Sequence, residues 1–283
     1  MVYLLILLGV SASIGEGLLV KAYGKKHTGG GFLFTGIISL FSMLFFVVTN
    51  QGGFQAAPEL FIYGILSGVA YAGAVVLTYV AFSIGSYALS NLILSYSLIF
   101  TVIYGLVFLK EKASVYTYIG FALLAVSIFL MRGKDQEKKG FSLKWLIAIL
   151  VSFAGSGIFG VLQRMQQIRF EDACSNEFMI ITLGISAGSL IIIGLFREKS
   201  GIKGIFSKGN LYAVGAGVCN GLTNMFTLIV NTMFELSRAS AVRSGLKLLI
   251  IYLISLLIFK EKFTKRQLVG AVVGAVSIIL FNF

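Results

Sequence analysis

Charged residues, proline, cysteine and histidine are all scarce in this sequence. Only 12% of the 283 residues are charged, and proline occurs once, at Pro58. A soluble domain carries about a quarter charged residues, so this chain could not cover a water-facing surface. The two cysteines and the single histidine exclude a disulfide framework, indicate no zinc site and leave little for histidine-based catalysis. Because Walker and dinucleotide-binding motifs are also missing, we expect no enzyme, cofactor, bound metal or ATP-driven step.

Hydrophobic residues are abundant instead. They make up 58% of the chain, and the mean hydropathy is +0.95. The net charge of +12 would suit nucleic-acid binding, but the basic residues lie mostly in short gaps between apolar stretches. The bilayer's own charge rule accounts for that pattern, so we expect lipid and no nucleic acid as partner. The composition predicts an integral membrane protein.

The apolar stretches are long enough to cross a bilayer. A spanning helix needs about 20 mostly apolar residues, and these stretches do not alternate as barrel strands do. The fold class is therefore predicted as all-α, with ten transmembrane helices. They are placed near residues 2–22, 32–49, 60–82, 87–109, 116–132, 143–163, 177–196, 210–231, 237–259 and 266–282.

The densest cluster of charge, Arg132 to Lys144, divides the predicted spans into two sets of five. It predicts a first unit at 1–132, a linker at 133–142 and a second unit at 143–283. The loops after the first, fifth, seventh and ninth spans hold most of the Lys and Arg residues, with Lys21 counted among them. The positive-inside rule then places both termini outside. We expect a multi-pass protein of the plasma (inner) membrane.

The two halves resemble each other in sequence. Residues 109–131 read LKEKASVYTYIGFALLAVSIFLM, and residues 259–281 read FKEKFTKRQLVGAVVGAVSIILF. At one constant spacing, Gly120 matches Gly270 and Ser127 matches Ser277, and the KEK triplets also coincide. Because each half has five spans, the second copy enters the membrane upside down. Inverted repeats of this kind recur among secondary transporters, whose substrate site lies near the midplane between the halves.

The duplicated five-span unit, the KEK clusters that close spans four and nine, and the glycine in each final span resemble the drug/metabolite transporter superfamily, in particular its EamA-like ten-helix branch. The resemblance covers essentially the whole chain and implies a transporter. It is poorly specific for substrate. The sequence departs from the family by lacking proline in spans four and nine, and by a charge bias opposite to the cytoplasmic termini of many members.

Several polar residues lie inside the predicted spans, where charge costs several kcal/mol unless it faces a partner or a wet cavity. Arg243 and Lys247 are four residues apart and share a helix face, and Glu16 lies deep in the first span. Together these positions predict one polar cavity that binds a small-molecule substrate. Its predicted residues are Glu16, Asn220, Asn224, Asn231, Arg243, Lys247, Asn91, Tyr71 and Tyr96.

The residue types indicate several cargoes. Two deep cations favour a carboxylate or phosphate, and Glu16 would receive an ammonium group or a coupling proton, so an amino acid or a carboxylated metabolite suits best. A tyrosine-plus-Glu16 site for an organic cation, a choline-like compound or a drug is the alternative. A flippase for a phospholipid head group is a further one. Glu16 pairing with Arg243 or Lys247 would instead hold the halves together. We expect a monomer or homodimer.

Overall fold

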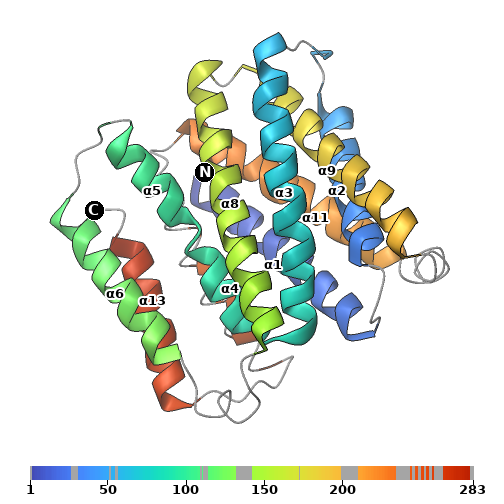
Figure 1. The fold of residues 1–283 in the computed structure, drawn as a ribbon. Coiled ribbons are helices and arrows are strands. Elements are labelled where there is room, and N and C mark those ends of the chain that lie inside the picture. Colours follow the sequence, from blue (N-terminus) through green and yellow to red (C-terminus); the bar gives the residue numbers. More distant parts are fainter. Residues whose placement is uncertain are drawn as a thin grey trace.

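Helices make up all the regular secondary structure of the residues described in the computed structural model. These residues are 2–26, 31–50, 52–54, 57–108, 110, 114–131, 142–171, 173–198, 210–233 and 264–280, with single positions between 243 and 257. The helices are α1 (Val2–Lys26), α2 (Gly31–Thr49), α3 (Pro58–Ile84), α4 (Tyr87–Ser95), α5 (Leu98–Val107), α6 (Val115–Met131), α8 (Leu143–Arg169), α9 (Ser175–Arg197), α11 (Asn210–Met233) and α13 (Lys265–Leu280). Figure 1 shows them as one bundle.

Six helices of the described chain are long and apolar enough to cross a membrane, namely α1, α2, α3, α8, α9 and α11. They confirm the prediction of an all-helical, multi-pass membrane protein. The helices α6, with 17 residues, and α13, with 16, match the predicted fifth and tenth spans closely. Most of span 237–259, the linker 133–142 apart from its last residue, and most of both KEK clusters lie outside the described residues.

The prediction of one continuous helix at 87–109 is wrong, because the structure divides this span into α4 and α5. At the break, the backbone N–H groups of Tyr96 and Ser97 donate to carbonyls only three residues back, at 3.1 and 3.0 Å. Just before it, the Ser95 hydroxyl donates to the Asn91 carbonyl at 2.8 Å. A serine that bonds back four residues competes with the helix ladder and bends it. No proline or glycine marks this break in the sequence.

Helices from the two halves pair across the bundle. The pairs are α1 with α11, α3 with α8, α2 with α9, and α6 with α13, and further contacts join α3 to α9 and α2 to α11. Figure 1 shows α6 and α13 side by side at one edge. Glycine permits two of these close approaches. A Cβ at Gly68 would lie 2.7 Å from Ile185 Cβ, and one at Gly217 would lie 2.6 Å from Phe41 Cβ. Small residues let helix backbones approach closely in lipid.

Two charged side chains tie helix ends together at the end of the bundle where α1 finishes. Lys21 is buried and donates from Nζ to the carbonyls of Phe82 and Gly85, at 2.5 and 2.6 Å. Lys21 is therefore not one of the loop charges predicted from the sequence. The Glu198 carboxylate accepts hydrogen bonds from the first backbone N–H groups of α2. A cation at the end of α3 and an anion at the start of α2 both complement the helix dipoles.

Candidate functional site

A cavity of about 340 Å³ lies between helices of both halves. Its wall is formed by α1, α2, α3, α4, α5, α8 and α11, with positions 243 and 247. Seven of the nine residues predicted for the site line it, namely Glu16, Tyr71, Asn91, Asn220, Asn224, Arg243 and Lys247. The volume falls within the range of small-molecule sites, about 300 to 1,000 Å³.

The acidic wall is organised by α1 and α11. Glu16 Oε1 accepts a hydrogen bond from Asn220 Nδ2 at 3.0 Å. The Asn220 side-chain oxygen accepts in turn from the Ser42 hydroxyl at 2.7 Å and from the Asn224 amide at 3.1 Å. This chain of donors fixes which side of the Asn220 amide faces the carboxylate. Hydrogen bonds to a charged group are the stronger kind, so Glu16 is held in one orientation.

The basic wall carries two cations, and neither forms an ion pair with a carboxylate of the described residues. Arg243 Nη1 donates to the Thr227 hydroxyl at 2.9 Å. Lys247 lines the same cavity one helical turn after Arg243. Among the described residues no ion pair joins Glu16 to either cation. An ion pair is present elsewhere, at the surface between Arg169 and Glu59, where Nη2 and Oε2 are 3.1 Å apart.

An aromatic and hydroxyl wall completes the cavity. The Tyr71 ring lies 5.1 Å from that of Phe159, centroid to centroid, and its hydroxyl faces Asn220 and Asn224 without a well-formed hydrogen bond. The helix α8 contributes Ser156 to the lining. Hydrogen-bond donors, acceptors and both signs of charge therefore meet around one space of substrate size.

Two of the predicted site residues lie away from the cavity lining. The Tyr96 hydroxyl donates to Ser127 Oγ at 2.8 Å, which places the ring against α6 and α13. Asn231 is buried beyond the cavity, where its Nδ2 approaches Gln167 Oε1 at 3.5 Å. Asn231 shares a helix face with the lining residues Asn224 and Thr227, but the cavity is shorter than that face. Tyr96 packs with Leu89 and Leu92, which do not line the cavity.

The contribution of α8 to the cavity wall was not predicted from the sequence. Ser156 and Gln163 line the cavity, and Gln167 follows one turn later on the same face. Residues four or seven apart lie on one side of a helix, so the spacing of these three polar residues could have indicated that α8 faces the cavity. The other lining residues that were not predicted include Ser13, Thr78, Ser97 and Thr223.

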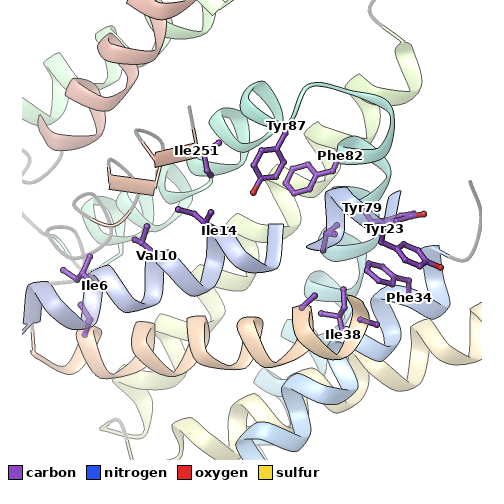
Figure 2. Packing of buried hydrophobic residues seen from close by; sticks show 14 residues of the cluster. Ile6, Val10, Ile14, Tyr23, Phe34, Ile38, Tyr79, Phe82, Tyr87 and Ile251 are labelled. Atoms are coloured by element: carbon purple, nitrogen blue, oxygen red, sulfur yellow. The ribbon is translucent and has the colours of Figure 1, made fainter. Parts of the chain in front are cut away.

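A group of aromatic side chains closes the end of the bundle near Lys21. We call it the aromatic end, and Figure 2 shows its members, Tyr23, Phe34, Tyr79, Phe82 and Tyr87, gathered where α1 and α3 finish and α2 begins. The Tyr23 and Phe34 rings stack with their centroids 3.8 Å apart. Phe82 and Tyr87 meet edge to face at 4.9 Å. Of these five residues Phe82 also lines the cavity, so the cluster borders the cavity at this end.

In the part of the chain that the structure describes, no group of three or more His, Cys, Asp or Glu side chains is placed to hold a metal ion. The polar groups of the cavity are one carboxylate, two cations, amides and hydroxyls. Such groups can bind a polar organic solute by ionic and hydrogen-bonded contacts.

Comparisons with known proteins agree with this architecture. The sequence model of the EamA-like transporter family matches residues 143–283. This match confirms the resemblance to the drug/metabolite transporter superfamily noted from the sequence. No curated protein matches the chain. One solved crystal structure is similar with a TM-score of 0.67 and 15% sequence identity, over 97% of this chain and 96% of the other. At that identity the likeness shows the fold alone.

Proposed function

We propose that this protein is a secondary transporter that moves a small polar organic solute by alternating access. The match of its second half to the EamA-like transporter family supports the transport role. An amino acid or a carboxylated metabolite is the favoured cargo. The observation that carries the proposal is the cavity between the halves, in which Glu16, Arg243 and Lys247 face one space without an ion pair among them. A solute with matching charges would supply the missing partners.

Reciprocal contacts between α6 and α13 are the first support for inverted repeats and so for alternating access. The Ser127 hydroxyl donates to the Gly270 carbonyl at 2.7 Å, and Ser277 donates to Gly120 at 2.7 Å. These are the same two pairs that match between the repeats in sequence. The late residue of each helix meets the early residue of the other, so α6 and α13 run antiparallel. Reciprocal contacts of equivalent residues are what a two-fold axis produces.

The other helix pairs are also consistent with a two-fold axis that relates the two halves. If α1 corresponds to α8, α2 to α9 and α3 to α11, then the α1–α11 pair is the counterpart of α8–α3, and α3–α9 is the counterpart of α11–α2. The sequence agrees at the cavity wall. Gly15-Glu16-Gly17 of α1 corresponds to Gly155-Ser156-Gly157 of α8. Two related halves around one site can exchange conformations and so switch the accessible side.

The charges of the cavity support a solute with a negative group. Arg243 and Lys247 outnumber Glu16, so a bound carboxylate balances the charge, while an ammonium group on the same solute would lie near Glu16. Glu16 is also the carboxyl group placed to couple transport to protons, since it lies in the cavity wall beside Asn220. We propose the plasma membrane as the location, with both termini outside as the loop charges indicate.

A cation site is the second candidate. Tyr71 and Phe159 lie beside Glu16 in the cavity wall and offer aromatic faces to an organic cation. Arg243 and Lys247 in the same wall would repel such a ligand. Tyr96, predicted as part of a tyrosine cage, lies outside the lining. The carboxylated solute is therefore the better fit.

A thermal-shift screen of purified protein tests the cargo. Amino acids, nucleotide-linked sugars, quaternary amines and phosphates would be compared, because a ligand that binds only the folded state raises the melting temperature. We expect stabilisation by carboxylated solutes, and expect Lys247→Ala to remove it while the unliganded protein stays folded. Lys144→Ala, at the exposed start of α8, is the matched control. Stabilisation by quaternary amines alone would replace the first proposal with the second.

Proton coupling is tested in proteoliposomes with an imposed pH gradient. The flux of a stabilising solute should follow the gradient in the parent protein. In Glu16→Gln, which keeps the shape and the hydrogen-bonding capacity of the side chain, the flux should no longer follow it. Flux that ignores both the gradient and this substitution removes Glu16 from the coupling role.

A further inference from the structure

A second polar cluster lies beyond the cavity, away from the aromatic end. Its members are Gln163, Gln166 and Gln167 of α8 and Asn231 of α11, and we call it the amide cluster. All four are buried, with Gln166 0% and Gln167 1% exposed. Glutamine is rarely buried unless its amide is hydrogen-bonded. The hydrogen bonds of this cluster are therefore informative.

The amides of the cluster are poorly satisfied. Neither Nε2 nor Oε1 of Gln166 has a hydrogen-bond partner among the described residues, and the same holds for Gln167 Nε2 and Asn231 Oδ1. The contacts that exist are long: Asn231 Nδ2 to Gln167 Oε1 at 3.5 Å, and Gln163 Nε2 to Met179 Sδ at 4.0 Å. Leaving buried amides without partners costs free energy that an apolar side chain of similar size would avoid. Stability of this state does not explain the glutamines.

The cluster continues the polar walls of the cavity. Gln163 lines the cavity, and Gln166 and Gln167 follow about one turn later on α8. On α11, Thr227 lines the cavity and Asn231 follows four residues later. The two polar stripes meet where Asn231 approaches Gln167. The cluster therefore lies at the point where the cavity ends towards the last turns of α8 and α11.

We propose that the amide cluster is a gate and transit site for the transported solute. In the described state its side chains close the path by a weak contact. When α8 and α11 separate at this end, the freed amides hydrogen-bond the passing solute or its water. This inference rests on the proposed function, since it assigns the route by which solute enters or leaves the cavity.

The chemistry of the gate fits the class of solute proposed for the cavity. An amide both donates and accepts, so it can satisfy a carboxylate, a hydroxyl or an ammonium group. It carries no charge, so it does not trap an ion as Arg243 and Lys247 would. Neutral amides therefore suit a transit position, where binding must be weak enough for release, and they favour a polar, hydrogen-bonding solute over an apolar drug.

Cysteine accessibility tests the gate without knowledge of the substrate. In a chain with Cys174→Ser and Cys219→Ala, either Gln167→Cys or Asn231→Cys is introduced. Membranes are treated with a small cationic methanethiosulfonate, and labelling is measured by mass spectrometry of the peptide that contains the new cysteine. Two gate positions are used because one variant alone could fold poorly.

In addition to the single gate cysteine, a pair of cysteines is introduced to lock the aromatic end shut. A Cβ at Gly24 would lie 3.2 Å from Ser83 Cβ, close to the 3.5 to 4.5 Å typical of disulfides, so Gly24→Cys with Ser83→Cys should cross-link α1 to α3. With one end locked, alternating access favours the state that is open at the other. If the open gate is a minor state of at most about 10%, the lock should raise the labelling rate at residues 167 and 231 about tenfold.

Three control positions make every outcome decisive. Leu183→Cys, fully buried near the cluster, should stay unlabelled, Thr232→Cys, exposed at the same end, should always label, and Ser156→Cys reports the cavity. The gate proposal is wrong if residues 167 and 231 stay as unreactive as residue 183 when the aromatic end is locked. It is also wrong if they label as fast as residue 232 without the lock. If residue 156 is also unreactive in both states, the cavity is not a water-filled site and the proposed function fails as well.

Discussion

The two ends of the cavity are closed by opposite kinds of contact. At the aromatic end, rings stack closely and the buried cation Lys21 has two carbonyl partners. At the other end, the amide cluster brings together polar groups of which several lack partners. Closely packed rings and a buried cation with two carbonyl partners stabilise a closed state, whereas unsatisfied amides raise its free energy. In this state the aromatic end is therefore the firmly closed one, and the amide cluster is the end prepared to open.

Truncating a ring at the aromatic end should have the largest effect on stability. Phe34 is fully buried and stacks on Tyr23. Phe34→Ala leaves a cavity and should lower the free energy of unfolding by about 3 kcal/mol. Thermal unfolding of the detergent-purified protein, followed by circular dichroism, measures this. Phe196→Ala is the control, because that ring is 78% exposed on the outer surface and should have little effect. Equal losses in both variants would contradict the comparison.

Removing the cation at the same end should come next. Lys21→Met keeps the apolar stem of the side chain but leaves the Phe82 and Gly85 carbonyls without the ammonium group. Hydrogen bonds to charged groups contribute about 1.5 to 3 kcal/mol, so we expect a loss of about 2 kcal/mol. The same unfolding measurement applies, with Lys144→Met, on the exposed start of α8, as the neutral control. An unchanged melting temperature would show that Lys21 does not hold this end closed.

The α6–α13 pair belongs to neither end and provides a scale for single hydrogen bonds. Ser277→Ala removes the bond to Gly120 and should cost about 1 kcal/mol. Ser127→Ala should cost more, because it also leaves the buried Tyr96 hydroxyl without its acceptor. Adding Tyr96→Phe to Ser127→Ala should recover part of that difference. Identical losses for the two serine variants would show that the Tyr96 bond contributes nothing.

The smallest effect is expected at the amide cluster itself. Gln166→Met replaces an unpartnered buried amide by an apolar chain of similar length, so stability should change by less than about 0.5 kcal/mol or should rise. Its near neutrality beside the loss in Phe34→Ala would sharpen the contrast between the ends. A loss as large as that of Phe34→Ala would mean that Gln166 has partners in the folded protein, and the contrast would be wrong.

Much of the fold could be predicted from the sequence, because hydropathy acts on each stretch separately. The described helices begin and end within a few residues of most predicted spans. The exception was the fourth span, where Ser95 and the turn at Tyr96 divide the helix without any proline or glycine signal. Lys21 was also misplaced, since nothing local indicates that two carbonyls of a distant helix end would receive its ammonium group.

The candidate site was predictable in composition and less so in extent. Helical spacing placed Asn220, Asn224 and Asn231 on one face, and the first two line the cavity. A stripe from Asn220 to Asn231 is about 16 Å long at 1.5 Å per residue. The cavity ends before it does, so Asn231 falls into the amide cluster. Where a stripe stops facing a cavity depends on which helix packs opposite, and a single helix carries no signal of that.

The sequence by itself determined the solvent, the helical class and the presence of deep charges, because composition and hydropathy are properties of the chain taken along its length. Only the tertiary structure decided which polar groups meet. It gave Glu16 an amide partner and placed Arg243 and Lys247 at the same cavity without an ion pair to it, and among the described residues it left Gln166 without a hydrogen-bond partner. Hydrogen bonds and ion pairs form only between groups in direct contact, so their presence depends on how helices distant in sequence pack against one another.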